Sequence, residues 1–171
     1  IPRLLRAVGT LAGTAPAAAQ AIYKFNNEIN QLRNSYGRRS PLRVFYEIWH
    51  RPLLTVNGHH MISDVISLCG GRNVFADAPV QTPTVSVEAV LAAQPDVVLG
   101  GGSAARAEEF AAQWRIAPVR ALRELPAFYV NPDTIQRQTP RIVEGAKVIC
   151  EALEKVRMNR QEKLIETADK R

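Results

Sequence analysis

The chain has 171 residues, 46% of them hydrophobic, which is enough for one domain with a sizeable core. No apolar run approaches the roughly 18 residues that a membrane-spanning helix needs. The net charge is +6, and part of it is local, because residues 155–171 hold six basic and three acidic residues. The other basic residues are scattered and form no aromatic-and-basic motif, so we do not expect a nucleic-acid partner.

The first 37 residues are predicted to be helical. Residues 2–11 read as a short helix that stops near Gly13. From Ala18 to Tyr36, apolar residues recur at alternating spacings of four and three, which predicts a long helix with one apolar stripe that ends at Gly37. A single stripe on so long a helix indicates that one side lies against something large.

After residues 38–41, strand and helix patterns alternate. Candidate strands are residues 43–49, 96–100 and 127–131, with an extended piece at 73–75, and candidate helices are residues 60–68, 86–94, 105–114 and 139–153. Such alternation with short connections predicts an α/β fold with a mainly parallel sheet flanked by helices. We therefore divide the chain into N-terminal helices (1–37), an α/β lobe (38–154) and a polar C-terminal tail (155–171).

The strongest local signal lies where the first of these strands ends. The β-rich run at residues 44–48 stops at Trp49, His50 and Arg51, because Pro52 cannot continue a strand. In parallel α/β sheets, ligands bind at the carboxyl ends of the strands. The three side chains are therefore candidates for a ligand-binding wall. The alternative is a core aromatic followed by two solvated turn residues.

Charged side chains near two helix starts are further candidates for recognition. Asp133 and Arg137 follow the last strand and lie four residues apart, so they can pair on one helical face and present polar groups to a ligand. Ser86 is a good N-cap, which places Glu88 in the first helical turn, where the helix dipole favours a carboxylate. We expect Glu88 to be exposed.

Two other patterns give little support for catalysis or metal binding. The Gly-Gly-Gly-Ser run at residues 100–103 lies between a strand and a helix, where backbone amides can surround a phosphate. Its spacing fits neither the dinucleotide fingerprint nor the Walker loop, which favours a close-packed turn. Neighbouring His59 and His60 point in different directions and are poorly placed to share a metal ion.

The two cysteines, Cys69 and Cys150, are too few for a zinc site and form no Cys-x-x-Cys pair. Each lies near the carboxyl end of a predicted helix. Free buried thiols are the default in the cytosol, whereas an exported protein would more often join them. The sequence pattern alone leaves both states open.

Five blocks of sequence occur in an order that carries a family resemblance. They are residues 44–56, 68–76 with Cys-Gly-Gly-Arg-Asn, 83–91 with Pro-Thr-Val-Ser-Val-Glu, 95–98 and 131–142. Together they resemble the second lobe of the periplasmic substrate-binding proteins that serve cobalamin ABC importers. Ferric-siderophore and haem binders share this fold, in which one long rigid helix joins two Rossmann-like α/β lobes. The resemblance covers residues 1 to about 154.

The resemblance implies that the helix at 18–36 is the interlobe connector and that the first lobe is missing from this chain. It also implies a periplasmic location, although residues 1–20 lack the basic start and apolar block of a secretory signal. A lone lobe supplies one wall of a cleft. We therefore expect it to bind ligand weakly and to expose apolar surface where the first lobe packed.

The resemblance also implies roles for individual residues. Trp49, His50 and Arg51 fall at the wall of the cleft, where an aromatic side chain stacks on a corrin or a similar macrocycle. Thr82 falls where cobalamin binders can carry a stacking aromatic. The acidic and basic pair after the last strand falls on cleft-lining positions.

Two further roles concern the outer surface and the cysteines. Glu88 matches the surface glutamate with which each lobe docks onto arginines of the membrane permease, and Cys69 and Cys150 match a pair that forms a disulfide in cobalamin binders. The implied function is capture of cobalamin or another corrinoid and its delivery to the permease, with no catalytic residue, catalytic cofactor or metal site. A ferric-siderophore or haem binder is the alternative in the same class. A Rossmann-like nucleotide-binding enzyme domain that uses residues 100–103 is the alternative from a different class.

Overall fold

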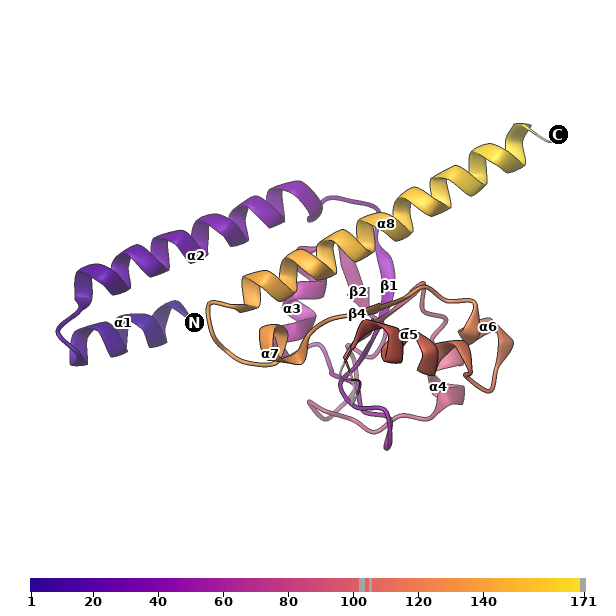
Figure 1. Ribbon diagram of the computed structural model, residues 1–171, viewed down its shortest axis with the longest axis horizontal. Coiled ribbons are helices and arrows are strands. Elements are labelled where there is room, and N and C mark those ends of the chain that lie inside the picture. Colours follow the sequence, from indigo (N-terminus) through magenta and orange to yellow (C-terminus); the bar gives the residue numbers. More distant parts are fainter. Residues whose placement is uncertain (102–103, 105, 170–171) are drawn as a thin grey trace.

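The computed structural model describes residues 1–101, 104 and 106–169 (Figure 1). The chain begins with two packed helices, α1 (Pro2–Leu11) and α2 (Ala15–Tyr36), both of which the sequence predicts. They approach closely because Gly9 has no side chain, and a Cβ at this position would collide with the Cβ of Ala18. Gly13, with a φ of 67°, makes the turn between them.

The α/β part is built on a four-stranded sheet with the order β2-β1-β3-β4, in which every neighbouring pair is parallel. The strands are β1 (Leu42–Glu47), β2 (Gly71–Asn73), β3 (Val97–Gly100) and β4 (Ala127–Tyr129). The central strands β1 and β3 are almost fully buried, as is usual for strands covered on both faces. Because all the strands are parallel, their carboxyl ends lie at one edge of the sheet.

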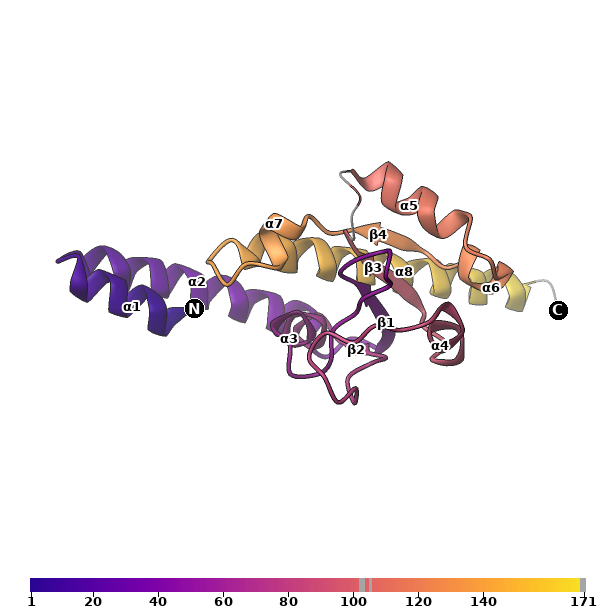
Figure 2. The same cartoon turned by 90° about the horizontal axis from the view of Figure 1, so that it is seen from below.

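Helices cover both faces of this sheet (Figures 1 and 2). One face packs against α2, α3 (Met61–Leu68), α7 (Pro132–Ile135) and α8 (Ile142–Asp169), and the other against α4 (Val87–Ala92), α5 (Ala107–Arg115) and α6 (Arg120–Arg123). Side chains of β1 alternate between the two cores: Val44 and Tyr46 enter the first, and Phe45 enters the second. The predicted α/β fold, a parallel sheet flanked by helices and preceded by a long helix, is confirmed.

Several ends of elements differ from the prediction. The first strand ends at Glu47 instead of Trp49, because the chain folds back after Ile48, whose N–H donates to the carbonyl of Leu54. The second strand lies at Gly71–Asn73 instead of residues 73–75. The sequence prediction also missed two short helices, α6 and α7, which have four residues each and no long periodic pattern.

The largest difference concerns the C-terminus. The helix predicted at 139–153 starts at Ile142 and continues to Asp169, so residues expected to form a polar tail are helical. The expected stop at residue 153 was wrong because residues 154–169 contain no Gly or Pro and consist mostly of good helix formers. From Met158 to Ala168 the side chains are exposed, as a polar segment requires. Within the described ranges, no helix combines the length and apolar character that a membrane crossing needs.

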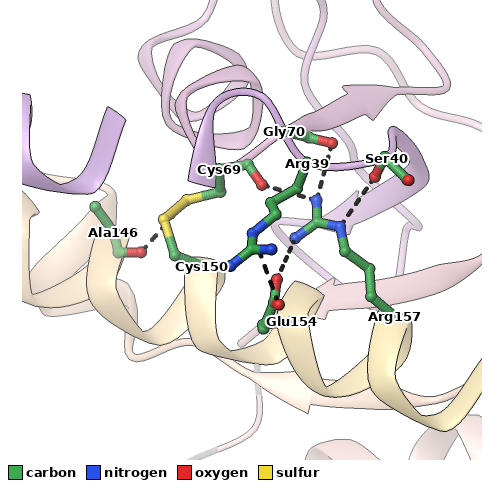
Figure 3. Close-up of polar contacts among 8 residues, drawn as sticks. All are labelled: Arg39, Ser40, Cys69, Gly70, Ala146, Cys150, Glu154 and Arg157. Atoms are coloured by element: carbon green, nitrogen blue, oxygen red, sulfur yellow. Dashed lines mark hydrogen bonds and ion pairs between the residues drawn. A yellow bond between two sulfur atoms is a disulfide. The ribbon is translucent and has the colours of Figure 1, made fainter. Parts of the chain in front are cut away.

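A disulfide joins α3 to α8 across the first core. Cys69 follows the last residue of α3, and its sulfur is bonded to that of Cys150, with the two Cα atoms 4.7 Å apart. Both cysteines are fully buried. The disulfide that the family resemblance implies is therefore confirmed (Figure 3).

About two turns further along α8, Arg157 ties the same region together with four polar contacts (Figure 3). Its Nη2 donates to the carbonyl oxygens of Cys69 (2.9 Å) and Gly70 (3.1 Å), and its Nε donates to the carbonyl oxygen of Ser40 (2.9 Å). Nη1 pairs with the carboxylate of Glu154 at 3.1 Å. The guanidinium thus satisfies carbonyl groups at the end of α3 and in the connection between α2 and β1.

Candidate functional site

The loops that leave the carboxyl ends of the strands form the candidate site. After β1 the chain makes a tight turn over residues 49–54, in which the N–H of Leu54 donates to the carbonyl of Trp49 at 2.9 Å. The indole Nε1 of Trp49 donates to the carbonyl of Arg51, also at 2.9 Å, and the Arg51–Pro52 bond is cis. Trp49 is 45% exposed. It is therefore a presented aromatic side chain and not the core aromatic of the alternative interpretation.

A second loop segment lies alongside this turn. The N–H of Thr55 donates to the carbonyl of Pro83 (3.1 Å), and the N–H of Val85 donates to the carbonyl of Leu53 (2.9 Å). Thr82, next to this pairing, is exposed. The structure thus brings the segment that carries Thr82 beside the turn that carries Trp49, although the two lie 33 residues apart in the sequence.

Three buried polar residues hold these loops on the end of the sheet, and the sequence analysis did not identify them. Asn73, the last residue of β2, donates through Nδ2 to the carbonyl of Val56 and to the hydroxyl of Ser63, both at 2.8 Å. Ser63 in turn donates to the carbonyl of Asn57 (2.7 Å), and Asn57 Nδ2 donates to the carbonyl of Ala78 (3.0 Å). Buried amides and hydroxyls of this kind fix irregular backbone that has no ladder partners.

Glu47 is the other residue that the sequence analysis missed. It ends β1 with no exposed surface, and its Oε2 accepts a hydrogen bond from Trp114 Nε1 of α5 at 2.8 Å. The Nδ1 atom of His50 lies 3.3 Å from the same oxygen. Burial raises the pKa of the Glu47 carboxyl, and the neighbouring His50 offsets this only in part. A glutamate in an apolar strand with a histidine three residues later is the signal that points to this pair.

A cavity of about 250 Å³ opens beside this cluster, between the 49–54 turn and α5. His50 and Arg51 line it from the turn, and Gln113 and Trp114 line it from α5. His50 is only partly exposed, with its ring turned toward Glu47. Arg51 is exposed.

Asp133 and Arg137 form the ion pair that their spacing predicts. Arg137 Nη2 lies 2.8 Å from Asp133 Oδ1, and both side chains are exposed. Asn131 starts α7 as its N-cap, accepting a hydrogen bond from the N–H of Asp133 at 2.9 Å. The pair follows β4, so it lies at the same edge of the sheet as Trp49, with β3 between them.

The glycine run at residues 100–103 lies partly outside the described residues, which include Gly100 and Gly101 but not Gly102 and Ser103. Gly100 has a φ of 143°, and a Cβ there would collide with the carbonyl oxygen of Glu47. A Cβ at Gly101 would come within 2.8 Å of the Pro132 ring. Close packing against Glu47 of β1 and Pro132 of α7 therefore accounts for these two glycines.

Side chains of different types cap the first turns of α4 and α3. Ser86 caps α4 as predicted, accepting a hydrogen bond from the N–H of Ala89 at 3.1 Å. Glu88 is exposed in the first turn, and its own backbone N–H and the Ser86 hydroxyl lower the pKa of its carboxyl. His60 caps α3 through Nδ1, which accepts from the N–H of Ile62 at 3.1 Å, and His59 is exposed. Among the described residues, no group of three His, Cys, Asp or Glu side chains could hold a metal ion.

Comparison with known proteins places this chain in a family. Residues 1–134 match the family model of the periplasmic binding proteins, and the chain belongs to that family. Vitamin B12-binding proteins of Yersinia pestis (strain Pestoides F) and Yersinia pseudotuberculosis (serotype O:1b) are each 36% identical to it over 136 residues. These residues make up 80% of this chain and 47% of each relative, so the chain spans about half the length of the curated relatives it matches.

Solved structures show the same fold. The periplasmic vitamin B12-binding protein BtuF of Vibrio cholerae superposes with a TM-score of 0.79 at 30% identity, over 92% of this chain and 61% of that protein. The periplasmic haem-binding protein RhuT of Roseiflexus sp. RS-1 superposes with a TM-score of 0.74 at 21% identity, over 91% of this chain and 62% of that protein. At this lower identity, the second likeness concerns the fold alone.

Proposed function

We propose that this chain is the second lobe of a solute-binding protein that captures cobalamin or another corrinoid in the periplasm and delivers it to the permease of an ABC importer. The observation that carries the proposal is the half-exposed Trp49 on a hydrogen-bonded turn at the ligand-binding edge of the sheet. The vitamin B12-binding relatives favour a corrinoid as the ligand.

The geometry of Trp49 suits a flat, largely apolar ligand. Its only polar atom, Nε1, is already bonded to the Arg51 carbonyl, so the side chain offers a ring face and not a hydrogen bond. Arg51 on the same turn, Thr82 on the neighbouring segment and the Asp133–Arg137 pair at the same edge of the sheet are exposed, and they present polar groups that can meet the amides at the rim of a corrin. In this proposal they form one wall of the cleft, and a first lobe supplies the other.

Glu88 is proposed as the contact with the permease. It is exposed at the start of α4 and belongs to a different helix from those that follow β1 and β4. An exposed carboxylate can form an ion pair with a cationic partner without any change in the fold.

A ferric-siderophore or haem binder is the second candidate, because a haem-binding protein shares the fold. The small side chain of Thr82 fits this candidate, since it leaves room where a stacking aromatic would stand. A nucleotide-binding enzyme has weaker support, because packing explains Gly100 and Gly101 without a phosphate.

The test is a ligand titration of the full-length natural protein that contains this chain. Cyanocobalamin, a ferric hydroxamate and haemin are added separately, and binding is followed by visible absorbance and by the quenching of tryptophan fluorescence. Saturable binding of cyanocobalamin at micromolar or lower concentration, with weaker binding of the other two, is the expected result. Tight binding of only the ferric hydroxamate or haemin would indicate a ferric-siderophore or haem binder. A rise in melting temperature with ATP or NAD would support a nucleotide-binding enzyme.

A further inference from the structure

The buried carboxylate of Glu47 has no role in the ligand wall described so far. A carboxylate in a protein interior is unfavourable unless its oxygens are partnered, and a hydrophobic residue of similar size would avoid this penalty. Only Oε2 has partners, His50 and Trp114, while Oε1 is buried without a hydrogen bond among the described residues. The side chain is therefore poorly explained by the stability of the fold alone.

What Glu47 does is connect three separate parts of the site. It belongs to the central strand β1, it bonds the indole of Trp114 on α5, and it contacts the imidazole of His50, the residue directly after Trp49. The ring of His50 also meets that of Trp114 edge to face, with centroids 6.5 Å apart. Trp114 is itself fixed in the second core by an edge contact with Phe45 at 5.6 Å.

The internal hydrogen bonds of the 49–54 turn do not provide this connection. The bridge between Trp49 and Leu54 and the bond from Trp49 Nε1 to Arg51 set the shape of the turn, but both partners belong to it. The pairing of Leu53 and Thr55 with residues 83–85 holds the turn on one side only. On the side of α5, the apolar side chain of Leu53 packs against the second core, and the polar link runs through His50 and Glu47.

We propose that Glu47 is a positioning residue, which orients the Trp49 ring by holding His50 against Trp114. Its effect on ligand binding depends on the proposed function, whereas its effect on the turn does not. His50 lies in the proposed ligand wall next to Trp49, and its role in this proposal is to anchor the 49–54 turn to α5.

The first experiment follows the turn without any ligand. The chain has two tryptophans, so a sample labelled with ¹⁵N-tryptophan gives two indole signals, and the heteronuclear NOE of each reports its mobility on the picosecond to nanosecond timescale. In Glu47→Met, which keeps an unbranched side chain of similar length and removes the acceptor, the NOE of Trp49 is expected to fall. His50→Ala should lower it as well, and the double variant should lower it no further, because both changes break one link.

The control is His59→Ala, which makes the same chemical change at an exposed histidine outside the turn and should leave both NOEs unchanged. Thermal unfolding separates positioning from a merely structural role. Glu47→Met removes a buried carboxyl group but leaves the indole N–H of Trp114 without its acceptor, so the two effects oppose each other and the melting temperature should change little while Trp49 becomes mobile. A Trp49 signal that stays ordered in both Glu47→Met and His50→Ala would overturn the proposal.

The second experiment measures the affinity of the full-length protein for cyanocobalamin. Glu47→Met and His50→Ala should each bind cyanocobalamin about two- to tenfold more weakly, because the ligand must then order a mobile side chain as it binds. The control variant His59→Ala should bind cyanocobalamin as tightly as the unsubstituted protein. Equal affinity in all three would overturn the part of the proposal that concerns the ligand. If the unsubstituted protein does not bind cyanocobalamin, the proposed function fails, and the NMR result still decides the role of Glu47 in the turn.

Discussion

Trp49 offers the broadest flat apolar surface at the carboxyl edge of the sheet, so its removal should affect a macrocyclic ligand directly. Trp49→Ala in the full-length protein is expected to weaken cyanocobalamin binding by about 1–3 kcal/mol, the usual loss for a well-packed aromatic anchor. Equilibrium titration measures the loss, and Trp49→Phe, which keeps a ring face, should recover part of it. Unchanged affinity in Trp49→Ala would remove this residue from the site.

Glu47 should also make the stability of the fold depend on pH. Burial raises its pKa in the folded state above the ordinary value of 4.5, so its contribution to stability is fully present below that value and is lost as the pH rises through the folded-state pKa. Relative to Glu47→Gln, the unsubstituted chain should therefore lose stability as the pH is raised above about 4.5.

Denaturant unfolding at a series of pH values measures this difference. His60 acts in the opposite direction, because burial lowers its pKa and its contribution is lost as the pH falls below the ordinary value of 6.5. Since His60 is present in both proteins, its contribution cancels, and the difference between them reports the Glu47 carboxyl together with its partner His50. A constant difference across the range would show that the carboxyl group titrates normally.

The disulfide between α3 and α8 closes a long loop, because its cysteines are 81 residues apart. In the chain-entropy model, such a loop stabilises the folded state by roughly 4–5 kcal/mol, although measured values are often smaller. The double variant Cys69→Ala, Cys150→Ala should therefore unfold at a much lower denaturant concentration than the oxidised chain. Ellman's reagent should find no thiol in the unreduced, denatured protein, and two titrating thiols would contradict the bond.

The regular elements could be predicted from the sequence because each depends on a local pattern. The stripe at residues 18–36 and the Ser86 cap are examples, and both agree with the structure. The polar network around Asn73 and the link from Glu47 to Trp114 could not be predicted, because their partners are brought together only by the packing of loops and helices. The sequence predicted that Trp49 and the residues after it lie at a strand end, but it did not predict that the ring of His50 turns inward toward Glu47.

The surface of α4 lets ligand capture and delivery be separated by experiment. Glu88→Lys in the full-length protein is expected to abolish ATP-driven uptake while affinity for the ligand in solution stays the same, because Glu88 is exposed and its loss leaves the core untouched. Transport into cells or proteoliposomes measures the first quantity and titration the second. Normal uptake with the reversed charge would show that this lobe docks elsewhere or serves no importer.

The N-terminal helices carry large apolar side chains that the chain itself does not cover. Leu4, Val8, Leu11 and Tyr23 are all more than half exposed. Leu4, Val8 and Leu11 are spaced four and three residues apart and so share one face of α1. Exposed apolar surface promotes association, so the isolated chain should self-associate as its concentration rises. Sedimentation velocity over a concentration series measures this, and a species that stays monomeric at the highest concentration would argue against a buried role for these helices.

The contacts of Arg157 have a mechanical consequence. Its bond to Ser40, together with the ion pair of Arg39 with Glu154 at 3.8 Å, fastens the connection between α2 and β1 to α8. The disulfide fastens α3 to α8 about two turns before Arg157. Because residues 39 and 40 are tied to α8, a torque applied at the far end of α2 should be transmitted to α8 and the sheet.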